Sequence, residues 1–190
     1  MASLLFVTHP EVVVDPAVPI ERWQLSHKGI ERIRAFSRSS VCADVRTVWA
    51  SGETKAIEAA GILAGALGLG IQVSKDLGEN DRSATGFLPP AEFEAVADAF
   101  FANPNTSIHG WERAIDAQTR VRQAVLRILA QHGEGDVAVV SHGAVGTLLF
   151  CALSGHAISR TFDQPSQGHW WKAVLPSLRP TSGWAPIAPR

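Results

Sequence analysis

The hydrophobic residues of this chain follow two spacings that alternate along its length. Short, largely apolar runs are typical of strands that are covered on both faces of a sheet. Five such runs occur, at residues 4–7, 45–50, 71–73, 137–140 and 170–175. Apolar residues three and four positions apart, the spacing of an amphipathic helix, occur between these runs at residues 27–36, 53–67, 91–101, 111–131 and 143–153. Strands that alternate with helices predict an α/β fold, a three-layer α/β/α sandwich with a largely parallel sheet.

The length of the chain predicts one domain. Its 190 residues, of which 46% are hydrophobic, suffice for a single buried core, and no internal repeat divides them. Turn residues dominate the segment that precedes the longest helix, and this segment carries one shorter helical pattern of its own. We therefore expect a single domain over residues 1–190, with a small insert at about residues 78–110.

The charge balance argues against two classes of partner. Lys and Arg total 17 and Asp and Glu total 18, so no basic surface is expected for a nucleic acid or an anionic membrane. The stretch at residues 137–159 carries no Lys, Arg, Asp or Glu, but Ser141, His142 and several glycines interrupt it. A buried strand followed by a buried helix explains this stretch better than a membrane span does.

Cysteine usage and the amino terminus bear on the compartment. Cys42 and Cys151 lie far apart in apolar surroundings, which predicts two buried free thiols rather than a disulfide. The first residues include no positively charged region, so no signal peptide is expected. Together these features predict a cytoplasmic protein. Trp170 and Trp171 leave two interpretations open, a strand with one exposed face or the contact surface of a homodimer.

Three groups of polar residues follow the predicted strands directly. Thr8 and His9 follow the first strand, Ser51 follows the second, with Lys55 close behind it, and His142 follows the fourth. Because ligands of open α/β sheets bind at the carboxyl ends of the strands, these groups are expected to meet in one crevice. A histidine beside cationic groups can attack phosphorus and hold the phosphoryl group covalently. The start of the helix after His142 would offer backbone N–H groups to phosphate oxygens.

Other chemistries find little support in the sequence. It contains no P-loop, no GxGxxG after the first strand, no GxSxG, no HExxH and no CxxC motif. Nucleotide-dependent kinases, serine hydrolases and zinc enzymes are therefore poor interpretations. His9 and His142 lack the short-range partner that most metal sites have, so we expect no metal and no cofactor.

The order of these residues resembles that of the histidine phosphatase superfamily, the phosphoglycerate-mutase-like fold, from Leu4 to about Leu175. The Arg-His-Gly of that family corresponds to Thr-His-Pro at residues 8–10, and its Leu-Thr-x-x-Gly to residues 25–29. Its Ser-Ser-Pro-x-x-Arg-Ala segment corresponds to residues 50–56, and its Leu-x-Glu to residues 77–79. Its Ser-His-Gly after an apolar strand is found unchanged at residues 141–143.

The resemblance implies an activity. In that family the first histidine accepts the phosphoryl group, which here would be His9, and His142 would be the second histidine of the site. The family's acid corresponds to Glu79, although Asp81 lies two residues further on and remains an alternative. The implied function is that of a metal-independent acid phosphatase that hydrolyses a small phosphorylated molecule through a phosphohistidine intermediate.

The departures from the family pattern fall on the residues that hold phosphate. Thr8 stands where the family has an arginine, and Lys55 replaces a second arginine, keeping the charge but not the forked geometry. We expect Thr8, Lys55 and Ser51 to bind the phosphate of the substrate, with Arg82 as the replacement cation. The alternative for Arg82 is a surface ion pair with Asp81 or Glu79. The alternative for the whole protein is a catalytically degenerate member that binds an anionic ligand or a protein partner without turnover.

Overall fold

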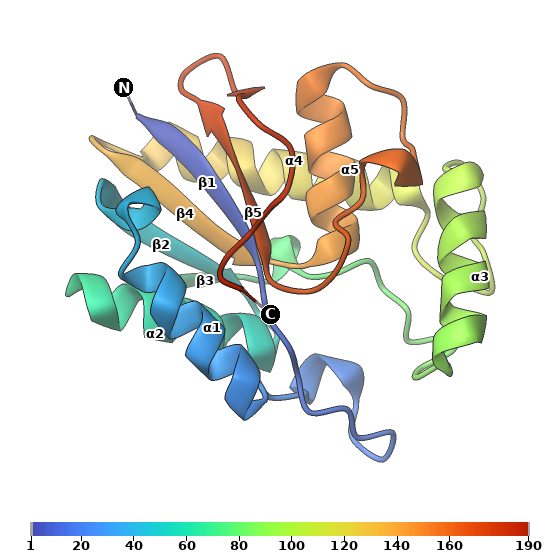
Figure 1. Ribbon diagram of the computed structural model, residues 1–190. Helices are drawn as coiled ribbons and strands as arrows, with labels where there is room; N and C mark the ends of the chain where they lie inside the picture. The colour runs from blue at the N-terminus through green and yellow to red at the C-terminus, as the bar shows by residue number, and fades with distance from the viewer. Residues whose placement is uncertain (1, 190) are drawn as a thin grey trace.

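The computed structural model describes residues 2–189, and a seven-stranded sheet runs through its centre (Figure 1). The strand order is β3-β2-β4-β1-β5-β6, and β7 pairs with β5. The first four strands in this order are parallel, and β5 is antiparallel to β1, so the expected largely parallel sheet is confirmed. The strands are β1 Ser3–Thr8, β2 Val45–Ser51, β3 Ile71–Ser74, β4 Asp136–Ser141, β5 His169–Val174, β6 Arg179–Pro180 and β7 Ala185–Pro186.

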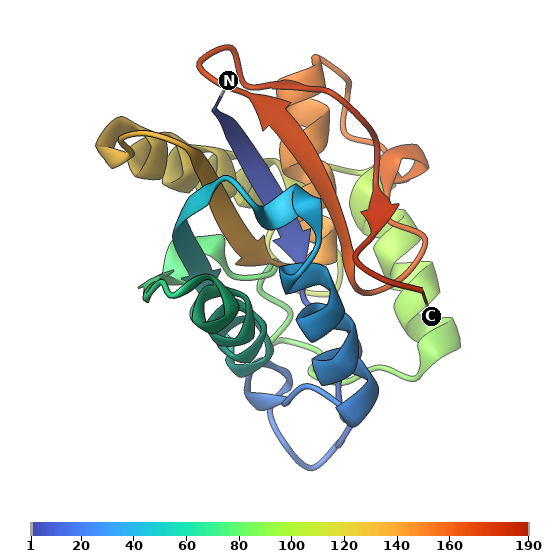
Figure 2. The same cartoon turned by 60° about the vertical axis from the view of Figure 1, so that its left-hand side comes forward.

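Helices cover both faces of the sheet, which confirms the three-layer α/β fold. Figures 1 and 2 show α1 and α2 together on one face and α4 and α5 on the other, with α3 beyond α5 at one side of the molecule. The five helices of the described residues are α1 His27–Ser37, α2 Thr54–Leu67, α3 Pro90–Ala102, α4 Ala114–Gln131 and α5 Gly143–Ser154.

Strand β1 shows why the apolar runs are continuous. Its residues Leu4 to Val7 are all fully buried. Leu5 and Val7 belong to the core beneath α1 and α2, whereas Leu4 and Phe6 belong to the core beneath α4 and α5. Successive side chains of a strand point to opposite faces, and here both faces are dry, so no polar residue alternates with the apolar ones.

The first turn of α1 lies directly against the chain that follows β1. The hydroxyl of Ser26 accepts a hydrogen bond from the N–H of Gly29 at 3.1 Å, the N-terminal cap that its side chain is suited to make. A Cβ atom added at Gly29 would lie 2.2 Å from the carbonyl oxygen of Glu11. Glycine therefore allows α1 to approach the segment that leads away from His9 and Pro10.

One helix starts later than its apolar pattern predicted. The pattern indicated residues 111–131, but α4 begins at Ala114. Gly110 has a left-handed conformation with φ of 82°, so the backbone immediately before Trp111 is not helical. Trp111 is instead buried against Phe93 and Phe100 of α3. Tertiary packing on α3 thus removes Trp111 from the helix to which its spacing had assigned it.

The two cysteines and the two adjacent tryptophans are accounted for within the chain. Cys42 and Cys151 are buried free thiols, as predicted. Trp171 is fully buried in the core and Trp170 packs against Phe36, so both rings have partners inside the chain. The homodimer stays a prediction.

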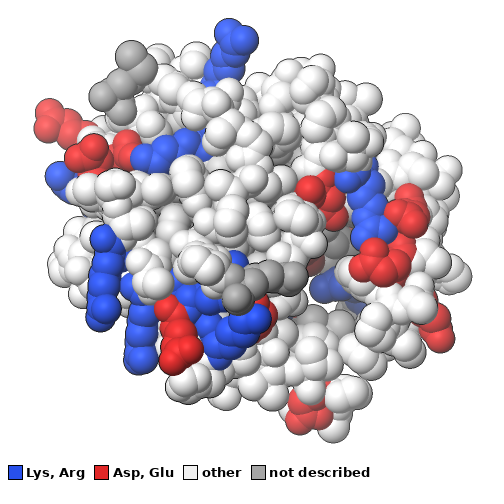
Figure 3. All heavy atoms as spheres, in the orientation of Figure 1, with Lys and Arg blue, Asp and Glu red and all other residues white. Residues whose placement is uncertain are grey.

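The protein surface carries both basic and acidic side chains. On the face shown in Figure 3, basic side chains lie among acidic ones, in keeping with the near-zero net charge. Within residues 2–189, every helix is too short or too polar to cross a membrane.

Candidate active site

The carboxyl ends of β1, β2 and β4 bring the two histidines together. Thr8 at the end of β1 pairs in register with Ser141 at the end of β4, and the N–H of His9 donates to the carbonyl oxygen of Ser141 at 3.0 Å. The rings of His9 and His142 then meet edge to face, with their centroids 5.2 Å apart. The two histidines thus lie together at the carboxyl edge of the sheet, as their positions at the strand ends predicted.

His9 is held in one protonation state and one tautomer. Its Nδ1 lies 2.9 Å from the carbonyl oxygen of Pro10, and because a carbonyl only accepts, Nδ1 must carry the hydrogen. Nε2 is left with its lone pair. Burial, followed by the charge of Lys55, lowers the pKa of His9 from 6.5 to about 4. The imidazole is therefore neutral at physiological pH and can act as a nucleophile through Nε2.

His142 makes both of its polar contacts through one nitrogen. Nε2 lies 2.6 Å from the hydroxyl oxygen of Ser51 and 3.2 Å from Oε1 of Glu53. Nδ1 is buried and, among the described residues, has no hydrogen-bond partner. A serine–histidine–acid triad needs the serine and the carboxylate on opposite nitrogens, so this arrangement is not one. Burial lowers the pKa of His142 well below 6.5, and the ring is neutral.

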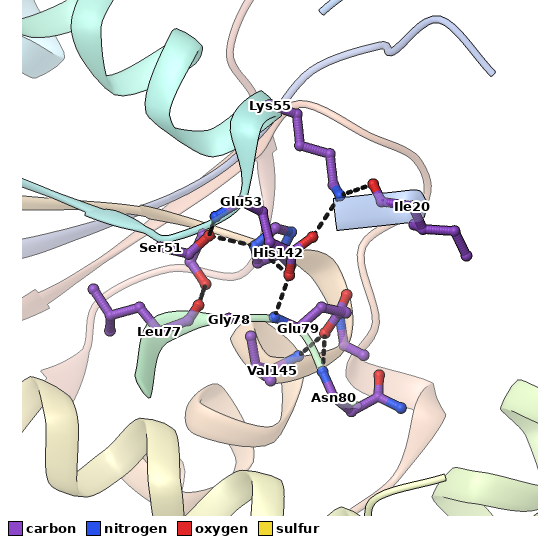
Figure 4. A network of polar contacts seen from close by, with 12 residues as sticks. Ile20, Ser51, Glu53, Lys55, Leu77, Gly78, Glu79, Asn80, His142 and Val145 are labelled. Atoms are coloured by element: carbon purple, nitrogen blue, oxygen red, sulfur yellow. Dashed lines mark hydrogen bonds and ion pairs between the residues drawn. The ribbon is translucent and has the colours of Figure 1, made fainter. Parts of the chain in front are cut away.

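A carboxylate that the sequence analysis did not single out lies at the centre of the site (Figure 4). Oε1 of Glu53 faces His142 and accepts a hydrogen bond from the N–H of Glu79 at 2.9 Å. Oε2 accepts one from Nζ of Lys55 at 2.5 Å. Burial acts to raise the pKa of Glu53, but His142 and Lys55 outweigh it and lower that pKa to about 2. Glu53 is therefore ionised. In the family motif its position is unspecified, which is why it was missed.

Lys55 is brought into the site, but its charge is already paired. Its side chain is buried, and Nζ donates to the carboxylate of Glu53 and, at 2.8 Å, to the carbonyl oxygen of Ile20. The one sequence signal that could have revealed this pair is the acid two residues before the lysine, at the position that caps α2.

The side chain of Glu79 reaches the N-terminus of α5. Its carboxylate accepts hydrogen bonds from the N–H groups of Val145 at 3.0 Å, Ala144 at 3.2 Å and Asn80 at 3.2 Å. The helix N–H groups that were expected to face phosphate are thus taken up by this acid, because a carboxylate is favoured at a helix N-terminus. Burial, and then the charge of Glu53, still raise the pKa of Glu79 against Arg82 and these N–H donors.

Asp81, the alternative acid, lacks both the burial and the raised pKa of Glu79. Its side chain is exposed and accepts a hydrogen bond from the N–H of Ser83 at 2.8 Å. Hydrogen bonds from Ser83 lower its pKa. Of the two candidate acids, Glu79 is the one whose environment favours a proton.

Arg82 lies beside the site without an ionic partner. Its guanidinium carbon is 5.1 Å from the ring centroid of Phe93 and 5.6 Å from that of Trp111, which are cation–π distances. No ion pair within residues 2–189 joins it to Asp81 or Glu79. Its charge nevertheless acts on Glu79 and His9, because it lowers the pKa of both.

The hydroxyl of Thr8 is bonded to the loop that precedes β5. It donates to Oε1 of Gln164 at 2.6 Å and accepts from the N–H of His169 at 3.0 Å, and the residue is fully buried. The amide nitrogen of Gln164 lies against Gly143, where an added Cβ atom would be 2.4 Å from it. Gln164 therefore fills the space between the residue before His9 and the residue after His142.

A cavity of about 560 Å³ opens beside these residues. One wall is apolar and consists largely of residues 16–20 together with Phe87. The other wall includes Glu53, Glu79 and Arg82, whereas neither histidine lines the cavity. A ligand in this space would meet the two carboxylates before it met His9. Among residues 2–189 there is no group of three or more His, Cys, Asp or Glu that could hold a metal ion.

Solved structures with this fold include several phosphatases. Mycobacterial glucosyl-3-phosphoglycerate phosphatase in complex with inorganic phosphate is 20% identical, with a TM-score of 0.82 over 98% of this chain and 99% of that chain. Phosphoserine phosphatase from Entamoeba histolytica in complex with 3-phosphoglyceric acid is 15% identical, with a TM-score of 0.77 over 97% and 98%. YhfR of Bacillus stearothermophilus is 19% identical, with a TM-score of 0.80 over 95% and 94%. At these identities the likeness shows the fold.

The sequence itself identifies the family. No curated protein matches this sequence. The family model of the histidine phosphatase superfamily, branch 1, matches residues 20–170. The matched region begins after residues 8–10, so the replacement of Arg-His-Gly by Thr-His-Pro stays a prediction. A match over most of the chain is nevertheless decisive for membership, and the protein belongs to branch 1 of the histidine phosphatase superfamily.

Proposed function

We propose that this protein is a metal-independent phosphomonoesterase that acts on a small phosphorylated molecule through a phosphohistidine intermediate. The observation that carries the proposal is the hydrogen bond from Nδ1 of His9 to the carbonyl oxygen of Pro10. It leaves Nε2 unprotonated in a neutral ring whose pKa burial has lowered to about 4. A histidine prepared in this way needs no base before it attacks.

The reaction has two displacements at phosphorus. In the first, Nε2 of His9 forms a bond to phosphorus as the ester P–O bond breaks, and Glu79 gives its proton to the leaving alkoxide. In the second, water attacks the phosphohistidine, the P–N bond breaks and the carboxylate of Glu79 takes a proton from the water. The N–H groups of Ala144 and Val145 stabilise Glu79 between the two steps, when it is ionised.

The relatives support this class of substrate. The names of the similar structures refer to glucosyl-3-phosphoglycerate phosphatase and phosphoserine phosphatase, both enzymes of small phosphate esters. Arg82 lines the cavity and has no ion-pair partner within residues 2–189, and His142 lies next to His9. We assign Arg82 and His142 to the phosphoryl oxygens. We also place the protein in the cytoplasm, because Cys42 and Cys151 are free thiols.

A second candidate function is binding without turnover. The observations that favour it are the pairing of Lys55 with Glu53 and of Thr8 with Gln164. Both residues stand where the family resemblance places arginines that hold phosphate. If these contacts persist when the ligand binds, the transferring phosphoryl group is stabilised by few charged donors, and the protein binds a ligand that it does not hydrolyse.

One experiment separates the two functions. Phosphate release from a panel of small phosphomonoesters is measured for the wild type and for His9→Ala. Quenching in base during turnover preserves the intermediate and quenching in acid destroys it, because a phosphohistidine is lost in acid and retained in base. We expect release by the wild type, and neither release nor intermediate in the variant. Release by His9→Ala would contradict the mechanism, and binding of the esters without release by the wild type would establish the second function.

A further inference from the structure

The charged residues that line the cavity are mostly acidic. Four acidic residues, Glu21, Glu53, Glu79 and Asp81, line it together with one cation, Arg82, and three of the four are ionised when Glu79 carries its proton. A cavity that takes a phosphate ester would be expected to carry the opposite excess, since a phosphate at neutral pH brings up to two negative charges. Phosphate binding therefore does not explain the acidic lining.

Glu53 also neutralises the cation nearest to the histidines. Both of its oxygens are engaged, one with Lys55 and one with the N–H of Glu79 and His142. The side chain of Lys55 is 4% exposed, so its charge has little water to screen it and is compensated by Glu53 instead. An incoming anion meets this ion pair rather than a free ammonium group.

We propose that Glu53 is a specificity-determining residue, whose carboxylate makes the cavity select phosphate esters with a positive charge on the alcohol part over those with a carboxylate. The proposal rests on the proposed function and names its substrate class. With the phosphoryl group at the histidines, the alcohol part extends into the cavity beside Glu53. A carboxylate there finds no free ammonium group, because Glu53 holds Lys55, and it meets the negative charges of Glu21 and Asp81. An ammonium group meets opposite charges instead.

The apolar part of the lining agrees with this selection. Residues 16–20 and Phe87 are apolar and place no competing charge beside the alcohol part. Phe87 also lines the cavity, and an aromatic ring attracts a cation but not a carboxylate.

Three esters of similar size test the proposal. They are ethanolamine phosphate, ethyl phosphate and phosphoglycolate, whose alcohol parts are positive, neutral and negative. For the wild type, kcat/KM is expected to decrease in this order, with at least about a tenfold difference between the first and the last. Glu53→Gln removes the charge and nearly keeps the shape; its single carbonyl oxygen can replace only one of the two oxygens that accept from Lys55 and Glu79. It is expected to lower that ratio about tenfold.

The control is Glu134→Gln, which makes the same change at an exposed residue just before β4, at the opposite end of that strand from the site. It should leave the ratio unchanged, and thermal unfolding verifies that both variants are folded. The proposal is overturned if the wild type prefers phosphoglycolate or if Glu53→Gln keeps the wild-type ratio. If no ester is hydrolysed, the proposed function fails, and dissociation constants measured by calorimetry give the same ratio. Failure of the wild type to bind ethanolamine phosphate would then overturn the selectivity too.

Discussion

At the scale of single residues, the environments of His9 and Glu79 move their pKa values in the directions that catalysis needs. Burial lowers the pKa of the histidine to about 4 and raises that of the acid above 4.5. The base form of His9 and the acid form of Glu79 are then present together in a window of pH that begins near 4. This pairing is the usual way in which one site holds a nucleophile and an acid at the same time.

The pH dependence of kcat/KM follows from these directions. Activity rises as the pH passes through about 4, because His9 loses its proton and gains its lone pair. It falls again at a pH above 4.5, where Glu79 ionises and can no longer protonate the leaving group. We expect Glu79→Gln to lower kcat by about 10²–10⁴ and to abolish the descending limb.

An ester with an acidic phenol as leaving group provides the control for this prediction. Such a phenol departs without a proton, so Glu79→Gln should impair its release less than that of an alkyl alcohol. Profiles of rate against pH for the alkyl and the phenyl ester, measured for the wild type and the variant, show whether the lost rate is that of leaving-group protonation. A descending limb that persists unchanged in Glu79→Gln would assign it to another group.

The chemistry of the site could be predicted only in part from the residues. His9 and His142 were accessible to prediction because each follows a buried strand directly, and parallel strands end at one edge. Glu53 was not, because its role depends on Lys55, Glu79 and His142, which come from three separate segments of the chain. The spacing of Glu53 and Lys55 could have indicated their ion pair, but no local pattern reports the contacts with Glu79 and His142.

At the scale of secondary structure elements, two helical glycines differ in the space around them: Gly29 is closely packed and Gly61 is not. Gly29 in α1 faces the carbonyl oxygen of Glu11, which also accepts a hydrogen bond from the N–H of Ser26 at 2.8 Å. Gly61 in α2 is exposed and has nothing within 4 Å of the position of a Cβ atom. Only the first of them is required by its surroundings.

Alanine at these two positions should therefore change stability in opposite directions. Gly61→Ala is expected to raise the free energy of unfolding by about 0.5–1 kcal/mol, the cost of glycine in a helix interior. Gly29→Ala is expected to lower it by about 1–3 kcal/mol, as overpacking does, and to reduce activity because Glu11 follows His9 closely. Urea denaturation measures both changes. Equal signs would mean that the contact with Glu11 yields without cost.

Most elements lie within one or two residues of their predicted bounds, and the exceptions have physical causes. Strand β1 and strand β4 were recognisable because burial on both faces leaves an unbroken apolar run. The start of α4 was wrong because Trp111 packs on α3, a contact that spacing cannot report. Strands β6 and β7 were not predicted, since two residues each carry no periodicity.

At the scale of the whole molecule, the two ends of the central strands have separate tasks. At the end away from the site, Asp136 is buried and binds the N–H of Ser3 at 2.8 Å and Nζ of Lys172 at 2.9 Å. One carboxylate thus joins β1, β4 and β5 where β4 begins. The groups to which we assign catalysis lie at the other end of β4, beyond Ser141.

Removal of this carboxylate should affect stability and leave the chemistry intact. Asp136→Ala leaves the N–H of Ser3 and the ammonium of Lys172 without their acceptor, at a cost of about 2–3 kcal/mol; Lys172 is partly exposed, which limits the loss. We expect a lower urea midpoint and an unchanged kcat per folded molecule. A fall in kcat larger than the fall in the folded fraction would show that the two ends are coupled.

The bond between Thr8 and Gln164 has a consequence for the history of this chain. If an ancestor carried the arginine that the family resemblance implies at position 8, its guanidinium needed the volume that the Gln164 side chain now fills beside Gly143. A single exchange at either position would crowd the interior or remove the nearer acceptor of the Thr8 hydroxyl, at 2.6 Å, and leave it the carbonyl oxygen of His169 at 3.3 Å. Positions 8 and 164 are thus expected to covary among close homologues. Their identities together would mark which branches of the lineage kept the guanidinium and which exchanged it for a neutral pair.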